Sequence, residues 1–264
     1  MEYRINFFES IILGIIQGIT EFLPISSSGH LLMARILFDI KDFNLFLEVC
    51  LHAGTLCSIL IFWRKEILIE IKKILKLDFN FLYNILLASV PAGVIGLLFK
   101  DIIENYFFNT SSYDFLIINY LIMSLILYIL KTWNIKDDNM TLKIAFIIGV
   151  AQVFAILPGI SRSGITICVA CLCGLSLQKS TKFSFFLAIP IMFFATFESM
   201  VSNLHIIRDT TLIKPFILGF ITSMITGYIV IKLLVDIILQ KKIWIFSIYC
   251  FCISLMLLFY NYVI

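Results

Sequence analysis

The chain has 264 residues, of which 61% are hydrophobic and only 14% are charged, whereas roughly a quarter of an average soluble domain is charged. This composition cannot cover a water-soluble surface. The net charge of +3 is too small, and too confined to short connecting segments, to form a surface that binds nucleic acid. We therefore expect a protein that is surrounded by membrane lipid and binds no nucleic acid.

Six apolar segments are long enough to cross a membrane, because a helix needs about 20 residues to span roughly 30 Å of hydrocarbon. In chain order they are Phe43–Trp63, Phe81–Phe99, Phe115–Trp133, Phe183–Leu204, Pro215–Leu239 and Ile243–Ile264. We predict a spanning helix for each segment. The predicted fold class is therefore an all-α polytopic membrane protein with six transmembrane helices.

Two further apolar segments, Phe7–Phe38 and Lys143–Leu175, are interrupted at their centres by Pro, Gly and Ser. The interruptions are Pro24-Ile25-Ser26-Ser27-Ser28-Gly29 and Pro158-Gly159-Ile160-Ser161-Arg162-Ser163-Gly164. A complete break predicts a re-entrant hairpin, which is a pair of short helices that enters the membrane and returns to the same side. Irregular backbone is tolerated at that depth only where protein packs around it or where it lines a wet cavity.

The two interrupted segments also resemble each other at an offset of 135 residues, with seven identities in 24 aligned positions. Residues Gly14, Gln17, Ile25, Ser26, Ser28, Gly29 and Leu37 match Gly149, Gln152, Ile160, Ser161, Ser163, Gly164 and Leu172. Because three predicted spans separate the hairpins, the second hairpin enters from the opposite face. We therefore predict one membrane domain with inverted-topology repeats of about residues 1–133 and 134–264, and a site near the midplane.

The predicted topology places thirteen basic residues on one side of the membrane and six on the other. The larger group is Arg64, Lys65, Lys72, Lys73, Lys76, Lys131, Lys136, Lys143, Lys179, Lys182, Lys232, Lys241 and Lys242, and the smaller group is Arg4, Arg35, Lys41, Lys100, Arg208 and Lys214. Cytoplasmic loops carry an excess of Lys and Arg. We therefore expect the larger group in the cytoplasm and both termini outside.

The hairpins contain polar groups that are unusual for the interior of a membrane. In the first hairpin they are Gln17, Glu21, Ser26, Ser27, Ser28 and His30, and in the second they are Ser161, Arg162, Ser163 and Thr166. Ionisable side chains at membrane depth are costly and therefore indicate function. Gln17 and Glu21 are four residues apart, so they lie on one face of a helix.

These residue types suit a phosphate group held between the two hairpin tips. Each tip begins a short helix, whose free N–H groups and positive dipole end attract an anion. Arg162 adds a permanent charge that can bind two oxygens at once. The carboxylate of Glu21 fits this site if a divalent cation links it to the phosphate, and His30 can transfer protons near neutral pH.

Structural explanations stand beside these functional ones. Ser26 and Ser161 could each be a helix N-cap, and His30 could bond only a neighbouring carbonyl. Glu21 and Arg162 could form a buried structural ion pair. Gln17 and Gln152 could join helices to one another, the interpretation favoured for Gln152. Glu48 and His52, one helical turn apart, could line the site or bond to each other.

Two long motifs resemble one known family. Gln17-Gly18-Ile19-Thr20-Glu21-Phe22-Leu23-Pro24-Ile25-Ser26-Ser27-Ser28-Gly29-His30 and Pro158-Gly159-Ile160-Ser161-Arg162-Ser163-Gly164-Ile165-Thr166 are similar to the motifs of the bacterial undecaprenyl-pyrophosphate phosphatase family, also called bacitracin-resistance protein BacA. The resemblance covers essentially the whole chain, including its length, six spans and two hairpins.

The resemblance implies a hydrolase of the bacterial cytoplasmic (inner) membrane whose active site faces outward. Its substrate would be the polyprenyl lipid undecaprenyl pyrophosphate, converted to undecaprenyl phosphate and phosphate, which returns the lipid carrier to peptidoglycan synthesis. A divalent cation, Mg²⁺ or Ca²⁺, would be the cofactor. A homodimer is compatible with the sequence, which does not define the oligomeric state.

The resemblance also implies roles for individual residues. Glu21 would assist the metal or water, Ser27 and His30 would take part in phosphoryl transfer, and Arg162 would hold the pyrophosphate. Substrate-binding positions would be Gln17, Ser26, Ser28, Ser161, Ser163 and Thr166. Many family members have Glu where this chain has Gln17, which leaves Glu21 as the main carboxylate. The nucleophile could be Ser27, His30 or an activated water.

A second class of function fits the same architecture. Inverted repeats with facing hairpins are found in secondary transporters, so the chain could move or flip a phosphorylated lipid. A transporter would show substrate movement without phosphate release, whereas a phosphatase would release phosphate. A structural or regulatory membrane protein would need neither turn for chemistry.

Overall fold

The computed structural model describes residues 6–38, 45–99, 114–133, 136–202 and 210–263. These residues form helices and no strand. The helices are α1 (Phe7–Phe22), α2 (Ser27–Leu37), α3 (Leu45–Phe62), α4 (Arg64–Leu75), α5 (Asn80–Leu98), α7 (Asp114–Thr132), α8 (Leu142–Val153), the short 3-10 helix η2 (Phe154–Ile156), α9 (Arg162–Leu172), α10 (Leu177–Ser202), α12 (Thr210–Leu239) and α13 (Ile245–Val263). The predicted all-α polytopic fold is confirmed.

The long helices match the six predicted spans. Five of the described helices, α5, α7, α10, α12 and α13, are long and apolar enough to cross a membrane. The helices α3 and α4 pass the same test together, but they bend by 75° at their junction. The first predicted span therefore corresponds to α3. At Trp63 the chain turns away from the axis of α3 and continues as α4.

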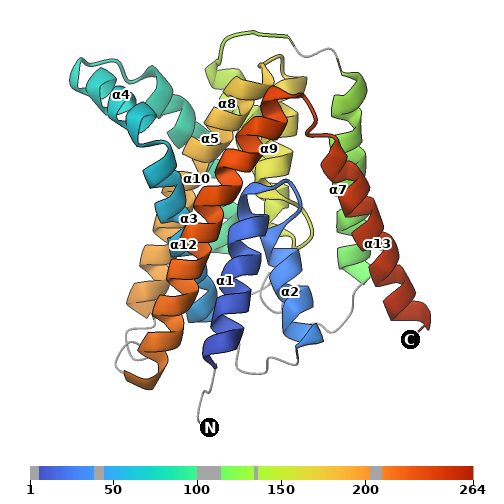
Figure 1. The fold of residues 1–264 in the computed structure, drawn as a ribbon. Coiled ribbons are helices and arrows are strands. Elements are labelled where there is room, and N and C mark those ends of the chain that lie inside the picture. The colour runs from blue at the N-terminus through green and yellow to red at the C-terminus, as the bar shows by residue number, and fades with distance from the viewer. Residues whose placement is uncertain (1–5, 39–44, 100–113, 134–135, 203–209, 264) are drawn as a thin grey trace.

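The two predicted hairpins are α1–α2 and α8–η2–α9. Figure 1 shows α1 and α2 joined at mid-height and entering from the end where both termini lie, while α8 and α9 enter from the opposite end. The two ends of the second hairpin are tied together, because the N–H of Asp138, before α8, donates to the carbonyl of Gly174, after α9, at 2.9 Å. Each hairpin therefore returns to the side from which it starts.

Small residues bring the first helix of each hairpin against a long helix. A Cβ atom at Gly14 of α1 would lie 2.7 Å from the carbonyl oxygen of Gly219 in α12. A Cβ at Gly149 of α8 would lie 2.6 Å from the carbonyl oxygen of Ala88 in α5. Close backbone approach through small residues is the usual packing of membrane helices, and here it fixes where the hairpins sit.

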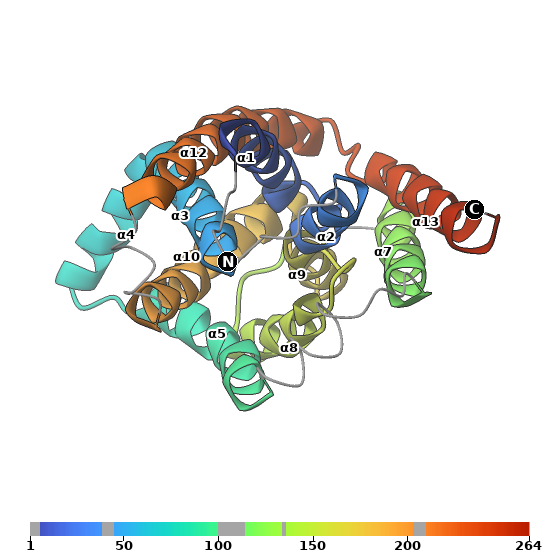
Figure 2. The same ribbon diagram turned by 90° about the horizontal axis from the view of Figure 1, so that it is seen from below.

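The hairpin tips lie inside the bundle. Seen from below, α2 and α9 occupy the middle, and α12, α3, α10, α5, α7 and α13 lie around them (Figure 2). The packed core includes Leu116, Tyr120 and Met123 of α7, which are fully buried with Ile160 and Ile165 of the second hairpin. The tips are therefore surrounded by protein and not by lipid.

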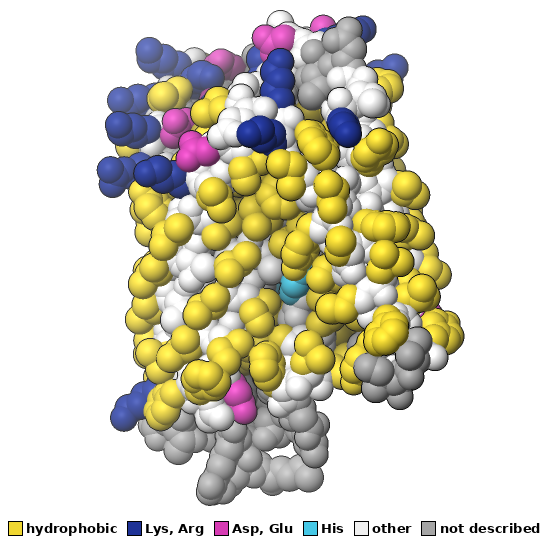
Figure 3. Space-filling view, turned by 45° about the vertical axis from the view of Figure 1, so that its right-hand side comes forward, with side chains coloured by type: hydrophobic (Ala, Val, Ile, Leu, Met, Phe, Trp, Pro, Cys, Tyr) yellow, Lys and Arg dark blue, Asp and Glu magenta, His cyan; other side chains and the backbone are white. Residues whose placement is uncertain are grey.

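The outer surface agrees with a lipid environment. Figure 3 shows a broad band of hydrophobic side chains across the visible face, with most of the visible Lys and Arg side chains gathered at one end. That end carries α4, which contributes Arg64, Lys65, Lys72 and Lys73, and Lys76 follows directly after the helix.

Candidate active site

Ser26 and Ser161 each precede the second helix of a hairpin. The Oγ of Ser26 accepts a hydrogen bond from the N–H of Gly29 at 3.3 Å, and the Oγ of Ser161 accepts one from the N–H of Gly164 at 3.1 Å. Both serines are therefore N-caps, which satisfy backbone donors that a helix start leaves without partners. The structural explanation for these two serines is confirmed.

The same serines fasten the two hairpin tips to each other. The N–H of Gly159 donates to the Oγ of Ser26 at 3.0 Å. The hydroxyls of Ser161 and Ser163 donate to the carbonyl of Leu23 at 3.4 and 3.3 Å. Chain segments more than 130 residues apart therefore meet through direct hydrogen bonds.

The turn before α2 is strained at Ser26, which has φ 67° and ψ 104°. Few residues other than glycine adopt positive φ, and holding one there costs on the order of 1–3 kcal/mol. The contacts of its side chain with both hairpins hold this conformation. Backbone strain of this kind is concentrated at functional sites, and it sets the direction of Ser27 and Ser28.

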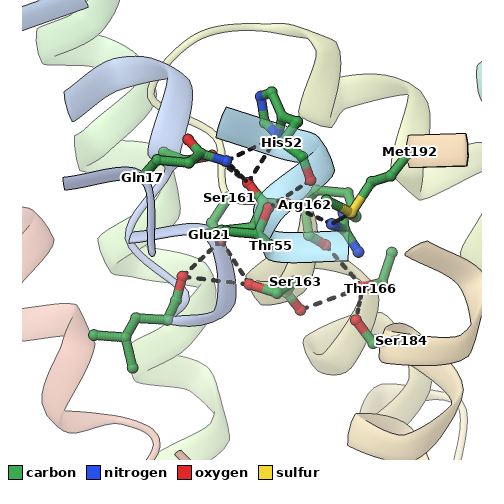
Figure 4. A network of polar contacts seen from close by, with 12 residues as sticks. Gln17, Glu21, His52, Thr55, Ser161, Arg162, Ser163, Thr166, Ser184 and Met192 are labelled. Atoms are coloured by element: carbon green, nitrogen blue, oxygen red, sulfur yellow. Dashed lines mark hydrogen bonds and ion pairs between the residues drawn. The ribbon is translucent and has the colours of Figure 1, made fainter. Parts of the chain in front are cut away.

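A buried ion pair joins the two hairpins. The Nη2 of Arg162 lies 2.6 Å from the Oε1 of Glu21, and the hydroxyl of Ser27 donates to the Oε2 of Glu21 at 2.7 Å. The side chain of Glu21 is 6% exposed and that of Arg162 is 17% exposed. Met192 of α10 also contacts this guanidinium, with its sulfur 3.5 Å from the same Nη2 (Figure 4).

This ion pair lies at a cavity of about 220 Å³ between the hairpins, α3 and α10. The polar lining residues are Glu21, Ser26, Ser27, Ser28, His52, Arg162 and Thr196, and the apolar ones are Val49, Ala155, Ile156, Ile160, Ile191, Met192 and Ala195. Sites for drug-sized ligands usually have roughly 300–1,000 Å³, so this cavity suits a small polar group. The pairing of Glu21 and Arg162 is thus also part of a candidate site.

His52 of α3 extends the polar cluster. Its Nδ1 lies 2.8 Å from the Nε2 of Gln17 and 3.5 Å from the Oε2 of Glu21. Because an amide nitrogen only donates, the Nδ1 of His52 acts as the acceptor in its contact with Gln17. Its Nε2 lies 3.9 Å from Glu48, so His52 both lines the site and approaches Glu48.

Two polar residues of the cavity are absent from the predicted set. The only indication in the sequence that His52 belongs to the site was its spacing of one helical turn from Glu48. That spacing fits a local contact between the two side chains equally well. Nothing in the sequence indicates that Thr196 belongs to the site, because a threonine within an apolar span usually bonds the backbone of its own helix. In the structure the Oγ1 of Thr196 is buried and has no partner among the described residues, so it can bond a ligand.

His30 lies apart from the other predicted catalytic residues. Its Nδ1 lies 2.7 Å from the carbonyl of Ser26, and its Nε2 lies 2.7 Å from the hydroxyl of Tyr249 in α13. The hydroxyl of Tyr120 lies 3.0 Å from Nδ1. His30 does not line the cavity. It faces α7 and α13, where it contacts two tyrosine hydroxyls as well as the neighbouring carbonyl.

The remaining predicted residues divide by location. Ser27 and Ser28 line the cavity with Ser26, whereas Ser161, Ser163 and Thr166 do not. The hydroxyl of Thr166 is buried against Ser184 at 2.7 Å, as Figure 4 shows.

The two related glutamines differ in their surroundings. The Nε2 of Gln17 donates to the Oε2 of Glu21 at 3.1 Å, beside the cavity. The Nε2 of Gln152 reaches the carbonyl of Ala88 in α5 at 3.5 Å. The favoured interpretation of Gln152 as a link between helices is confirmed.

A divalent cation would find few protein ligands here. No group of three or more His, Cys, Asp or Glu side chains within the described ranges could hold a metal ion. Glu21 offers hard oxygen donors at the cavity. Gln17 faces Glu21 with its amide nitrogen, and its buried Oε1 has no hydrogen-bond partner in the described part of the chain. Mg²⁺ is often bound by one or two carboxylates together with substrate phosphates. These residues fit a cation that protein and substrate hold jointly.

The arrangement is suited to an anion. Ser27 and Ser28 form the first turn of α2, where backbone N–H groups have no acceptor within the helix. The guanidinium of Arg162 has five N–H donors, more than the Glu21 carboxylate can accept. A phosphate in the cavity would therefore meet a helix N-terminus from one hairpin and an arginine from the other.

Fold and cavity together define a polytopic membrane protein in which two re-entrant hairpins enclose a candidate site whose polar lining suits an anionic group. Residues 10–256 match the family described as bacitracin resistance protein BacA. The chain belongs to this family.

Similar proteins cover nearly the whole chain. An undecaprenyl-diphosphatase of Carboxydothermus hydrogenoformans is 38% identical over 96% of this chain and 97% of its own length. Proteins of the same name from Methanococcus vannielii and Christiangramia forsetii are 35% and 33% identical, with 96% and 97% of this chain and 99% of each relative covered. The similarity therefore includes both motifs and all six spans.

Proposed function

We propose that this chain is an undecaprenyl-diphosphatase, which hydrolyses undecaprenyl pyrophosphate to undecaprenyl phosphate and phosphate. Membership of the family and the names of the relatives support this activity. The observation that carries it is the contact of Arg162 and Ser27 with the two oxygens of Glu21. Residues from both motifs thereby form one cluster in one cavity.

In this proposal the terminal phosphate binds between Arg162 and the N-terminus of α2. Phosphoryl transfer depends mainly on positioning and on neutralising charge, and both groups supply positive potential at fixed positions. The apolar wall formed by Ile191, Met192 and Ala195 excludes water around the phosphate, which strengthens these electrostatic contacts. The prenyl chain remains outside this small cavity.

Glu21 is the proposed proton acceptor. In either route the bond between the terminal phosphorus and the bridging oxygen breaks, and undecaprenyl phosphate leaves. If Ser27 attacks this phosphorus, its proton passes to the Oε2 of Glu21, and water then hydrolyses the phosphoserine to release phosphate. If water attacks directly, Glu21 takes the proton from water. The first route uses the hydrogen bond of 2.7 Å between Ser27 and Glu21, whereas attack by His30 would need the imidazole to leave Tyr249.

A divalent cation, Mg²⁺ or Ca²⁺, is the proposed cofactor, with Glu21 as its protein ligand and the amide oxygen of Gln17 nearby. When bound, it would neutralise negative charge on the pyrophosphate. The position of the Glu21 carboxylate in the cavity lining supports this role.

We also propose a location in the bacterial inner membrane, with the basic α4 end in the cytoplasm and the substrate delivered from the outer side. The excess of basic residues at that end supports this orientation. The transporter alternative is not favoured, because the relatives are named as diphosphatases.

The direct test is phosphate release from a long-chain prenyl pyrophosphate by detergent-purified protein. We expect release that a chelator abolishes and added Mg²⁺ or Ca²⁺ restores. If no phosphate is released with any cation, the proposal is refuted and the transporter function is favoured instead. If a chelator leaves phosphate release unchanged, only the proposed role of the divalent cation is refuted.

A further inference from the structure

A second and larger cavity lies on the membrane-facing side of α10. It has a volume of about 440 Å³ and runs between α4, α5 and α10. Its apolar walls include Ile71 and Ile74 of α4, Leu82 and Leu86 of α5, and Phe193 of α10. It shares no lining residue with the candidate active site. We call it the α4 groove.

The helix α4 has the pattern of a helix that lies in a membrane interface. Ile67, Ile71 and Ile74 recur on one side at spacings of four and three residues and line the groove, while lysines occupy much of the opposite side. Leu68 and Leu75 remain 56% and 78% exposed. An amphipathic basic helix that turns by 75° from a spanning helix fits the boundary between headgroups and hydrocarbon.

The end of the groove near α4 carries positive charge. Glu70 is buried and lies 3.1 Å from the Nζ of Lys73 and 3.5 Å from that of Lys182. The Nζ of Lys182 also lies 5.8 and 5.5 Å from the ring centroids of Phe81 and Phe186, both of which line the groove. Asp78 also lines the groove, so two carboxylates balance Lys73 and Lys182. The positive excess at this end comes from Arg64, Lys65, Lys72 and Lys76, which face only Glu66 as a further acid of the segment.

We propose that the α4 groove binds a membrane phospholipid with an anionic headgroup. One acyl chain lies between α4, α5 and α10, and the phosphate lies at Lys182 and Lys73. Three observations select this occupant: the long apolar groove, the cations at one end only, and the position of α4 among the basic residues (Figure 3). Such a lipid would brace α4 and α5 against α10, which carries Met192 and Thr196 of the active site.

Two pairs of variants test separately the contribution of the apolar groove and that of the positive charge of Lys182 to lipid binding. Leu82→Trp fills the groove, and Tyr83→Trp is its control, because Tyr83 is the next residue of α5, is 57% exposed and lies outside the groove. Lys182→Gln removes the charge while Glu70 keeps Lys73 as a partner, and Lys182→Arg preserves the charge.

The experiment uses delipidated, detergent-purified protein and two probes, dioleoylphosphatidylglycerol and dioleoylphosphatidylcholine. Melting temperature gives stabilisation and native mass spectrometry gives lipid retention. We expect the anionic lipid to stabilise the wild type more than the zwitterionic one, and Leu82→Trp to lose that effect. Lys182→Gln should weaken binding of the anionic lipid about fivefold, the scale of one lysine at an anionic surface. Tyr83→Trp and Lys182→Arg should resemble the wild type.

Equal stabilisation of the wild type and Leu82→Trp, or no preference for the anionic lipid, would overturn the proposal. If Leu82→Trp fails to fold, the Lys182 pair decides the matter by lipid retention alone. A third result would assign the groove to the substrate chain and also overturn the proposal: Leu82→Trp raises KM for a long-chain but not a short-chain prenyl pyrophosphate, with unchanged lipid stabilisation.

Discussion

Glu21 is the residue at which the polar contacts of the site converge. Its carboxylate contacts Arg162, Ser27, Gln17 and His52, and these residues come from three separate parts of the chain. A buried carboxylate needs such partners to remain ionised in a low-dielectric interior. The same contacts hold it where a proton acceptor for phosphoryl transfer would be required.

The hydroxyl of Ser27 has a direct test in the variant Ser27→Ala. We expect kcat to fall at least about a hundredfold, because the variant removes either the nucleophile or a contact made in the transition state. Ser89→Ala is the matched control, since Ser89 bonds only its own helix, through the carbonyl of Ile85 in α5. Wild-type kcat in Ser27→Ala would exclude a role for this hydroxyl.

His30 is predicted to affect the reaction through the turn that it braces. Its bond to the carbonyl of Ser26 lies one residue before Ser27, and small misplacements of reacting groups are costly. We expect His30→Ala to lower kcat at least about tenfold with little change in KM, and Tyr249→Phe to act in the same direction but more weakly. Full activity of His30→Ala would contradict any role for this residue.

The residues that sequence alone could identify were those in the two motifs. Glu21, Ser27 and Arg162 do meet in the cavity, but sequence did not distinguish Ser161 and Ser163, which join the tips, from Ser28, which lines the cavity. It left the role of His52 open and missed Thr196, because α3 and α10 bring these residues to the site only through tertiary packing. Residue type and spacing define which groups are polar, whereas three-dimensional packing decides where they point.

At the scale of helices, hydropathy predicted the spans well and the interfacial parts less well. The helix α10 begins at Leu177, six residues before the predicted Phe183, because its polar first turns continue the helix beyond the hydrocarbon. The helix α4 has too many charges to be found as a span. Apolar runs report where lipid begins and ends, and helices continue past that boundary.

The crossing of α8 and α5 is predicted to fix the second hairpin. Gly149→Ala places a Cβ against the backbone of Ala88, and overpacking of this kind costs about 1–3 kcal/mol. We expect a lower melting temperature for Gly149→Ala in detergent. In Gly96→Ala the added Cβ meets no atom within 4 Å, so this control should melt no lower than the wild type. Equal melting of all three proteins would contradict the proposed packing.

At the scale of the whole molecule, the pairing of helices follows a pattern. The helix α1 packs on α12 and α8 packs on α5, and Gly14 and Gly149 occupy related positions in these contacts. We propose that the halves, about residues 1–133 and 134–264, are inverted repeats, in which each half supplies one hairpin and the other half supplies the helix that supports it. One site between the halves follows from that arrangement.

The orientation of the molecule is open to labelling in spheroplasts. We expect a membrane-impermeant thiol reagent to modify Lys214→Cys in intact spheroplasts and Lys76→Cys only after the membrane is opened, because the basic α4 end should be cytoplasmic. A background without the seven native cysteines removes competing labels. Labelling of Lys76→Cys in intact spheroplasts would show that the orientation is the reverse of the proposed one.

The joint site of the two hairpins is tested most directly by kcat/KM for phosphate release in Glu21→Ala, Arg162→Ala and the double variant. We expect each single variant to lose at least about a hundredfold, and the double variant to be about as active as the weaker single variant, because residues that act as one unit are not additive. Arg64→Ala on α4 should keep wild-type activity. Near-normal activity in either single variant, or fully additive losses in the double variant, would contradict a single pyrophosphate site shared by the two hairpins.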